Sequence, residues 1–75
     1  MSLNELAPGA RARVTSVDGA DAVTQRLMEL GLIEGSLVEV VRLAPLGDPM
    51  DLRLHGYHLS VRKADAARVQ VAPCA

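Results

Sequence analysis

The chain contains a single aromatic residue, Tyr57, and lacks both Phe and Trp. Any hydrophobic core must therefore consist of aliphatic side chains, mainly Leu and Val. A chain of 75 residues lies near the lower size limit for such a core, because it buries only about 60% of its unfolded surface. We therefore expect residues 1–75 to form one domain, with no active-site cleft between two lobes.

The scarcity of aromatic residues also argues against several classes of ligand. Single-stranded nucleic acids stack their bases on aromatic side chains, and proline-rich peptides bind in aromatic-lined grooves. The formal net charge is −1, whereas affinity for duplex DNA comes mainly from clustered Lys and Arg. We therefore expect no nucleic-acid partner.

Several features of the sequence predict a cytoplasmic location. No apolar run approaches the ~18 residues that a membrane-spanning helix requires, and the N-terminus lacks the pattern of a signal peptide. The lone cysteine, Cys74, has no second cysteine with which to form an internal disulfide, which suits a reducing compartment. We therefore also expect no direct membrane insertion.

One α-helix is predicted at residues 21–30. Asp21 suits the N-cap position, and the apolar residues 23, 27 and 30 share one face. Gly31 follows at the position that favours a left-handed C-cap. Near the N-terminus, Ser2-Leu3-Asn4-Glu5 fits a capping box at the start of a single helical turn.

Most other segments are short and either alternate between apolar and polar residues or are strongly apolar. We predict strands at residues 10–18, 37–43, 51–55, 58–62 and 68–72. A bulge is expected near Thr15-Ser16, a two-residue hairpin turn at Gly56-Tyr57, and one helical turn at residues 63–67. About five strands with one short α-helix between the first two predict a mainly β fold that closes as a small barrel.

Four blocks of sequence follow one another along the chain: Leu6-Ala7-Pro8-Gly9; Arg26-Leu27-Met28-Glu29-Leu30-Gly31-Leu32 with Gly35; Ala44-Pro45-Leu46-Gly47-Asp48-Pro49; and Gly56-Tyr57 with Leu59, Arg62 and Asp65-Ala66. Together they resemble the FeoA family of bacterial ferrous-iron-transport proteins, over about residues 3–71. Val61 departs from the pattern, since Leu is commoner there. The resemblance implies one SH3-like domain with a cytoplasmic accessory role, which binds and modulates FeoB, a membrane Fe(II) transporter with its own GTPase domain.

We expect this chain not to be an enzyme and to require no cofactor. It has no Gly-x4-Gly-Lys-(Ser/Thr) motif that would hold a nucleotide. Cys74 lies near the end of the chain with no base fixed beside it, and a nucleophile needs an oriented base. The expected activity is therefore binding to a partner.

Three residues are candidates for contact with that partner. Leu46 and Met50 are apolar residues in and after the loop at residues 44–49, and burial of each against a partner would contribute roughly 1.5–3 kcal/mol. The alternative is that both fold over one end of the barrel. Arg26 lies off the apolar face of the helix, where it pairs with an acidic partner surface, is simply solvated, or forms a local hydrogen bond to the next loop.

The alternative function is binding or sensing of a transition metal, Fe2+ or Zn2+. If Gly56-Tyr57 forms the turn, His55 and His58 lie opposite each other with Cβ atoms ~5 Å apart, and imidazoles accept both ions. A tight site needs three or four ligands, so Cys74, Asp48 or a second molecule would have to complete it. An exposed polar hairpin is the simpler interpretation. A homodimer through an open barrel edge is also left open.

Overall fold

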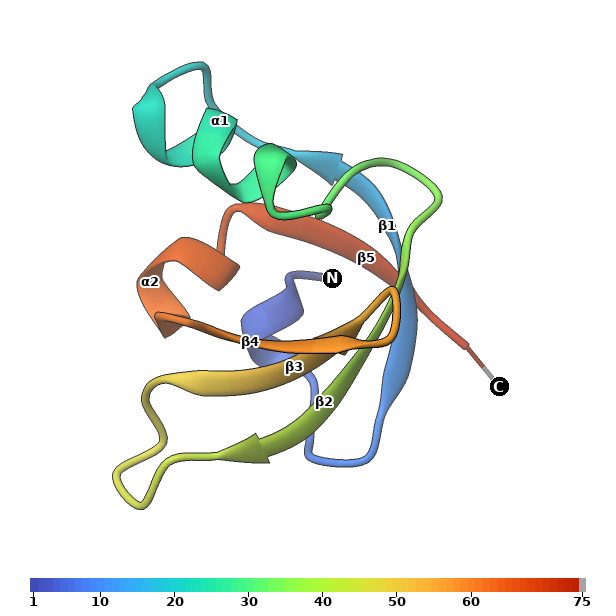
Figure 1. Ribbon diagram of the computed structural model, residues 1–75, viewed down its shortest axis with the longest axis vertical. Coiled ribbons are helices and arrows are strands. Elements are labelled where there is room, and N and C mark those ends of the chain that lie inside the picture. Colours follow the sequence, from blue (N-terminus) through green and yellow to red (C-terminus); the bar gives the residue numbers. More distant parts are fainter. Residues whose placement is uncertain (75) are drawn as a thin grey trace.

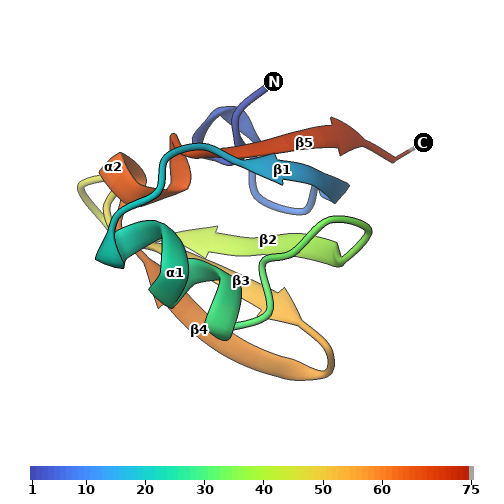
Figure 2. The ribbon, with the colours of Figure 1, turned by 90° about the horizontal axis from the view of Figure 1, so that it is seen from above.

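The computed structural model describes residues 1–74, which form one curled, antiparallel five-stranded sheet in the order β4-β3-β2-β1-β5 (Figure 1). The elements in chain order are η1 (Leu3–Glu5), β1 (Arg11–Val17), α1 (Ala22–Glu29), β2 (Leu37–Leu43), β3 (Met50–Leu54), β4 (Tyr57–Val61), α2 (Lys63–Ala66) and β5 (Val69–Pro73). Both α-helices lie on the same side of the sheet in Figures 1 and 2. The predicted mainly β fold with a helix between the first two strands is confirmed.

The end of α1 follows from its sequence. The Leu32 N–H donates to the Leu27 carbonyl at 3.1 Å, and the Gly31 N–H donates to the Met28 carbonyl at 3.0 Å. These are the two bonds of a Schellman motif, which places Gly31 at φ +106°, a conformation that glycine adopts readily. Leu27 and Leu32 are both buried, so the helix end is fixed to the core.

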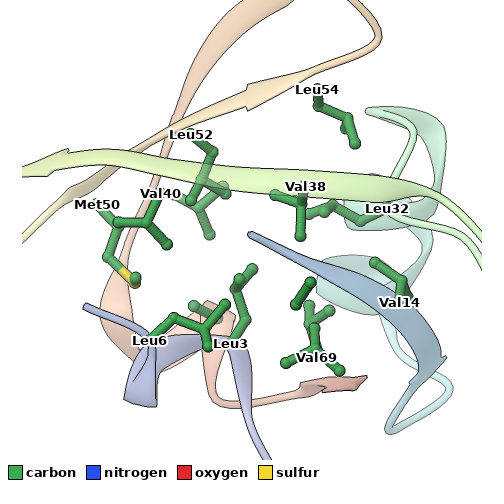
Figure 3. Close-up of a cluster of buried hydrophobic side chains, with 14 of the residues drawn as sticks. Leu3, Leu6, Val14, Leu32, Val38, Val40, Met50, Leu52, Leu54 and Val69 are labelled. Carbon is green, nitrogen blue, oxygen red and sulfur yellow. The ribbon is translucent and has the colours of Figure 1, made fainter. Parts of the chain in front are cut away.

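The core lies on the concave face of the sheet and is entirely aliphatic (Figure 3). Each strand contributes side chains to this core, and the helical segments η1, α1 and α2 contribute further ones. The buried hydrophobic residues are Leu3, Leu6, Ala12, Val14, Leu27, Leu32, Val38, Val40, Met50, Leu52, Leu54, Val61, Ala66, Val69 and Val71.

The two edges of the sheet differ. The outer edge of β5 is covered by the N-terminus, because the Val71 N–H donates to the Met1 carbonyl at 2.8 Å and Ser2 bridges Gln70. The side chain of Ser2 makes no capping hydrogen bond to η1, so the predicted capping box is wrong. Within residues 1–74, β4 pairs only with β3, and the sheet therefore has one covered edge and one open edge.

The predicted strand irregularity is present, but the predicted hairpin turn is displaced by one residue. The β1–β5 register shifts between Val14 and Ser16, which confirms the bulge. Leu54 pairs with Tyr57, so the turn is His55-Gly56, with φ +53° and +81°. Positive φ at both positions is typical of a type I′ turn.

The observed hairpin register has a packing advantage. It places Met50 opposite Val61 and gives five consecutive cross-strand pairs between β3 and β4. Both of these residues are buried, so the register adds an apolar pair at the end of the ladder.

We predict that Leu52→Ala lowers the free energy of unfolding by about 2–5 kcal/mol, because it leaves a cavity in the core. Leu52 has no exposed surface, whereas Leu46 is 97% exposed. The control Leu46→Ala should change the free energy of unfolding by no more than about 0.5 kcal/mol. Urea denaturation followed by far-ultraviolet circular dichroism measures both. Equal losses in the two variants would contradict the described core.

Candidate functional site

Three segments that are distant in sequence meet at one end of the barrel, which we call the helix end: α1, α2 and the loop of residues 44–49 (left side of Figure 1). The Lys63 N–H at the start of α2 donates to Asp48 Oδ1 of the loop at 2.9 Å. Arg26 Nη2 of α1 lies 3.6 Å from Asp65 Oδ2 of α2. The short helix α2 therefore links the other two segments.

The start of α1 is held by a polar cluster around Asp21. The Asp21 carboxylate accepts a hydrogen bond from the Thr24 N–H at 3.1 Å, which is the N-cap bond that the sequence predicts. It also accepts two contacts from Arg68 Nη1, at 2.7 and 2.8 Å. The hydrogen bond from Arg68, assisted by that from Thr24, lowers the pKa of Asp21 from 3.8 to about 2. This cluster ties the helix to the segment that precedes β5.

The far end of α1 is held by Tyr57. Its hydroxyl donates to the Leu30 carbonyl, one of the carbonyl groups that lack a partner at a helix C-terminus. The only aromatic side chain is thus used to attach α1 to β4. It is 43% exposed and lies outside the buried cluster.

Two of the three predicted partner-contact residues are exposed at the helix end. Leu46 is 97% exposed, more than any other large hydrophobic residue among residues 1–74. The side chain of Arg26 is 63% exposed beside Asp65, and an exposed ion pair of this kind contributes little to stability. Both residues are therefore available to a partner.

Met50 does not lie on the surface. It has no exposed area, and its side chain points into the core beside Val40 (Figure 3). The prediction that Met50 contacts a partner is therefore wrong, and the alternative, in which it covers one end of the barrel, describes it better. The reason is positional, since Met50 is the first residue of β3 and faces inward with Leu52 and Leu54.

The predicted opposition of His55 and His58 is also wrong. His58 lies across from Arg53, and its Nε2 accepts a hydrogen bond from Arg53 Nε at 3.3 Å. His55 is in the turn itself. The residues proposed as additional metal ligands have other partners. The Asp48 carboxylate accepts a hydrogen bond from the first residue of α2, and the Cys74 N–H donates to the carbonyl of residue 11 in β1.

The described residues offer no preformed metal centre. Within residues 1–74, no group of three or more His, Cys, Asp or Glu lies close enough to hold a metal ion. Metal binding by His55 and His58 stays a prediction, now without the geometry that suggested it.

A groove beside the open edge of β4 was not predicted from the sequence. Its volume is about 350 Å³, and it runs between α1, β4 and α2, lined by Arg26, Leu27, Leu30, Ser60, Val61, Arg62 and Asp65. The pair Arg62-Lys63, directly after a strand, is the sequence signal that marks its end. Such a signal becomes meaningful only when the strand is known to lie at an edge.

The model of the FeoA domain family matches residues 1–73. The chain belongs to the FeoA family. It is 38% identical over 71 residues to a fusion of Fe(2+) transport protein A and the Fe(2+) transporter FeoB in Porphyromonas gingivalis. The match covers 95% of this chain but only 8% of that relative, so this chain corresponds to a small part of the fusion protein.

Two solved structures show the same fold at substantial identity. FeoA from Chlorobium tepidum is 45% identical with a TM-score of 0.92, and the match covers 100% of this chain and 71% of that one. FeoA from Stenotrophomonas maltophilia, described as an SH3 domain protein and crystallised with zinc, is 34% identical with a TM-score of 0.85. That match covers 96% of this chain and 89% of the other. The SH3-like prediction is confirmed.

Membership places this FeoA chain in a family of small accessory domains linked to ferrous iron transport. Among residues 1–74, no helix combines the length and apolarity needed to cross a bilayer.

We predict that the Asp21 cluster stabilises the fold at neutral pH and loses its effect in acid. Because the pKa of Asp21 is 3.8 as an ordinary carboxyl and about 2 when folded, the unfolded chain binds this proton first as the pH falls. The stabilisation is therefore complete only above about pH 5 and is lost progressively as the pH falls towards 2.

The measurement is the thermal midpoint of wild type and Asp21→Asn at several pH values. The wild type should be more stable near neutral pH, and the difference should shrink between about pH 5 and pH 2. Glu34→Gln, which removes an exposed carboxylate in the turn before β2, is the matched control and should follow the wild type. A difference that is constant with pH would show that Asp21 is not held by Arg68.

Proposed function

We propose that this FeoA chain is a cytoplasmic accessory protein that binds the cytoplasmic part of an FeoB-type ferrous iron transporter and modulates its GTPase-coupled transport. The observation that supports this is the fusion in Porphyromonas gingivalis, in which a domain 38% identical to this chain is part of the same polypeptide as FeoB. Fusion raises the effective concentration of one partner at the other. Such an arrangement favours two domains that act together.

The helix end is the surface that we assign to this contact. Leu46 lies in a closed loop, since the Ala44 N–H donates to the Pro49 carbonyl at 3.1 Å and the Gly47 N–H donates to the Ala44 carbonyl at 2.7 Å. A loop that is already ordered loses little conformational freedom on binding. Leu46 is therefore presented as a pre-organised apolar anchor.

Arg26 supplies the polar part of the same surface. Its ion pair with Asp65 is exposed, so a carboxylate of the partner can replace or share it at little cost. An apolar anchor with charged residues around it is typical of a protein–protein contact, where the polar rim adds specificity more than affinity.

We predict that Leu46→Ala weakens binding to the cytoplasmic domain of FeoB by at least about tenfold. Loss of an apolar side chain that is buried on binding removes roughly 1.5–3 kcal/mol. The control is Leu37→Ala, which changes a 40% exposed leucine at the opposite end of β2 and should bind as the wild type does.

Titration calorimetry in the presence of GDP and of a non-hydrolysable GTP analogue measures these affinities. Unchanged affinity of Leu46→Ala would remove the helix end from the contact. Absence of saturable binding in either nucleotide state, with full-length FeoB as well, would overturn the transporter proposal itself.

A second candidate function is the binding of a divalent transition metal, favoured by the zinc complex of the Stenotrophomonas maltophilia FeoA. In this chain His55 and His58 are exposed and would act as separate donors, because the hairpin register does not bring them together. Each would need further ligands from water or another molecule.

We predict weak Zn2+ binding that is lost in the double variant His55→Ala/His58→Ala, because the imidazoles are its donors. Titration calorimetry under reducing conditions measures it. Cys74→Ser is the control, since Cys74 is an exposed thiol that also suits zinc. Binding that survives in the histidine variant and disappears in Cys74→Ser would contradict the assignment.

A further inference from the structure

We propose that the open edge of β4 binds an extended peptide segment, which joins the sheet as a sixth, antiparallel strand. The segment carries an acidic residue at its N-terminal end, followed by alternating apolar and polar residues. The groove beside this edge shares Arg26 with the surface assigned to the transporter but does not include Leu46, and the proposal stands whether or not the partner is a transporter.

The backbone of β4 has hydrogen-bonding groups available for such a strand. In a two-residue hairpin the pair that flanks the turn, here Leu54 and Tyr57, is hydrogen bonded, and such pairs then alternate along the ladder. The N–H and C=O groups of His58 and Ser60 consequently point away from β3. None of these four groups bonds another part of residues 1–74.

The edge also lacks the features by which proteins usually protect an edge strand. Natural edges carry Pro or charged side chains, or are covered by another segment. Residues 57–61 are Tyr-His-Leu-Ser-Val, without Pro, Lys, Arg, Asp or Glu. The other edge of the same sheet, on β5, is covered by Met1 and Ser2, so β4 is the edge that is left unpaired.

The surroundings of the edge define which side chains the added strand needs. The 350 Å³ groove borders Ser60 and Val61 on one side, and Leu27 of α1 and Leu30 directly after α1 on the other. Successive side chains of a strand point to opposite faces. Every second side chain of the added strand would therefore face α1, where the half-buried Leu30 offers an apolar contact beside the exposed Arg26, and the others would lie beside His58 and Ser60 on the solvent side.

Charge defines the end of the segment. Arg62 and Lys63 follow β4 directly, and neither forms an ion pair with another of residues 1–74. A strand antiparallel to β4 begins beside the last residue of β4, so its N-terminal residues would meet these two cations. An acidic residue at that position is complementary to them.

The same charges argue against a second copy of this chain as the occupant. If two β4 strands paired antiparallel, Arg62 of each copy would lie near the other copy's hairpin turn, which consists of His55 and Gly56. The turn provides no carboxylate. A peptide with an acidic start therefore fits the edge better than β4 itself does.

The test uses the capped peptide acetyl-Asp-Glu-Val-Thr-Val-Thr-Val-amide as the probe and the 15N-labelled chain. Binding should protect the amides of His58 and Ser60 from hydrogen exchange, and the amides of residues 52 and 54 should change little. Ser60→Pro removes an outward N–H that the β3 ladder does not use and should weaken binding about tenfold. Ser60→Ala keeps that N–H, loses the same hydroxyl bond to Asp51, and should bind as the wild type does.

Two further measurements keep the result decisive if Ser60→Pro does not fold. Two versions of the peptide, N-methylated at odd or at even positions, should differ about tenfold or more in affinity, because only one set of amides faces β4. Equal affinities of the two versions, or protection located elsewhere than His58 and Ser60, would overturn the proposal. The proposal would also be overturned if the free chain sedimented as a dimer and the Ser60→Pro variant as a monomer. The edge of β4 would then bind a second copy of the chain.

Discussion

The fold depends on packing aliphatic side chains from both halves of one curled sheet without any aromatic ring to fill the space between them. Leu and Val side chains are small, so the strands alone cannot close the interior, and short helical segments must supply the rest. They contribute side chains with almost no exposed surface: Leu3 from η1, Leu27 from α1 and Ala66 from α2. The helical segments are therefore required to fill the core, whether or not they also form a binding surface.

This requirement explains where the polar contacts occur. Each helical segment is short and has ends whose backbone groups need partners, and these ends are the points at which the segments are attached. Asp21 and Arg68 hold the start of α1, the Tyr57 hydroxyl holds its end, and the Lys63 N–H bonds the loop through Asp48. The helix end is consequently held in place by polar contacts at the ends of its segments, which suits a surface that must stay ordered before it meets a partner.

Most features fixed by neighbouring residues were predictable, although the capping box at Ser2 was not, whereas the exact register between the strands was not predictable from local sequence. Asp21 and Gly31 specify the limits of α1 locally, and its Schellman ending forms as expected. The opposition of His55 and His58 failed because it depended on the hairpin register. The prediction that Met50 contacts a partner was wrong because Met50 follows a loop with two prolines. The local sequence does not show whether such a residue still belongs to the loop or already begins the next strand. Leu46 and Arg26 were identifiable as exposed, but the groove beside β4 required the strand order.

The hairpin register has a consequence beyond the histidines. With a turn at Gly56-Tyr57, the inward faces of β3 and β4 would be unchanged, since Leu52 and Leu54 would still point into the core. The outward backbone groups, however, would belong to Leu59 and Val61 instead of His58 and Ser60. Hydrophobic alternation therefore cannot decide which amides the open edge presents. The decision comes from the left-handed turn at His55-Gly56 and from the burial of Met50 opposite Val61, so core packing determines the recognition chemistry of the edge.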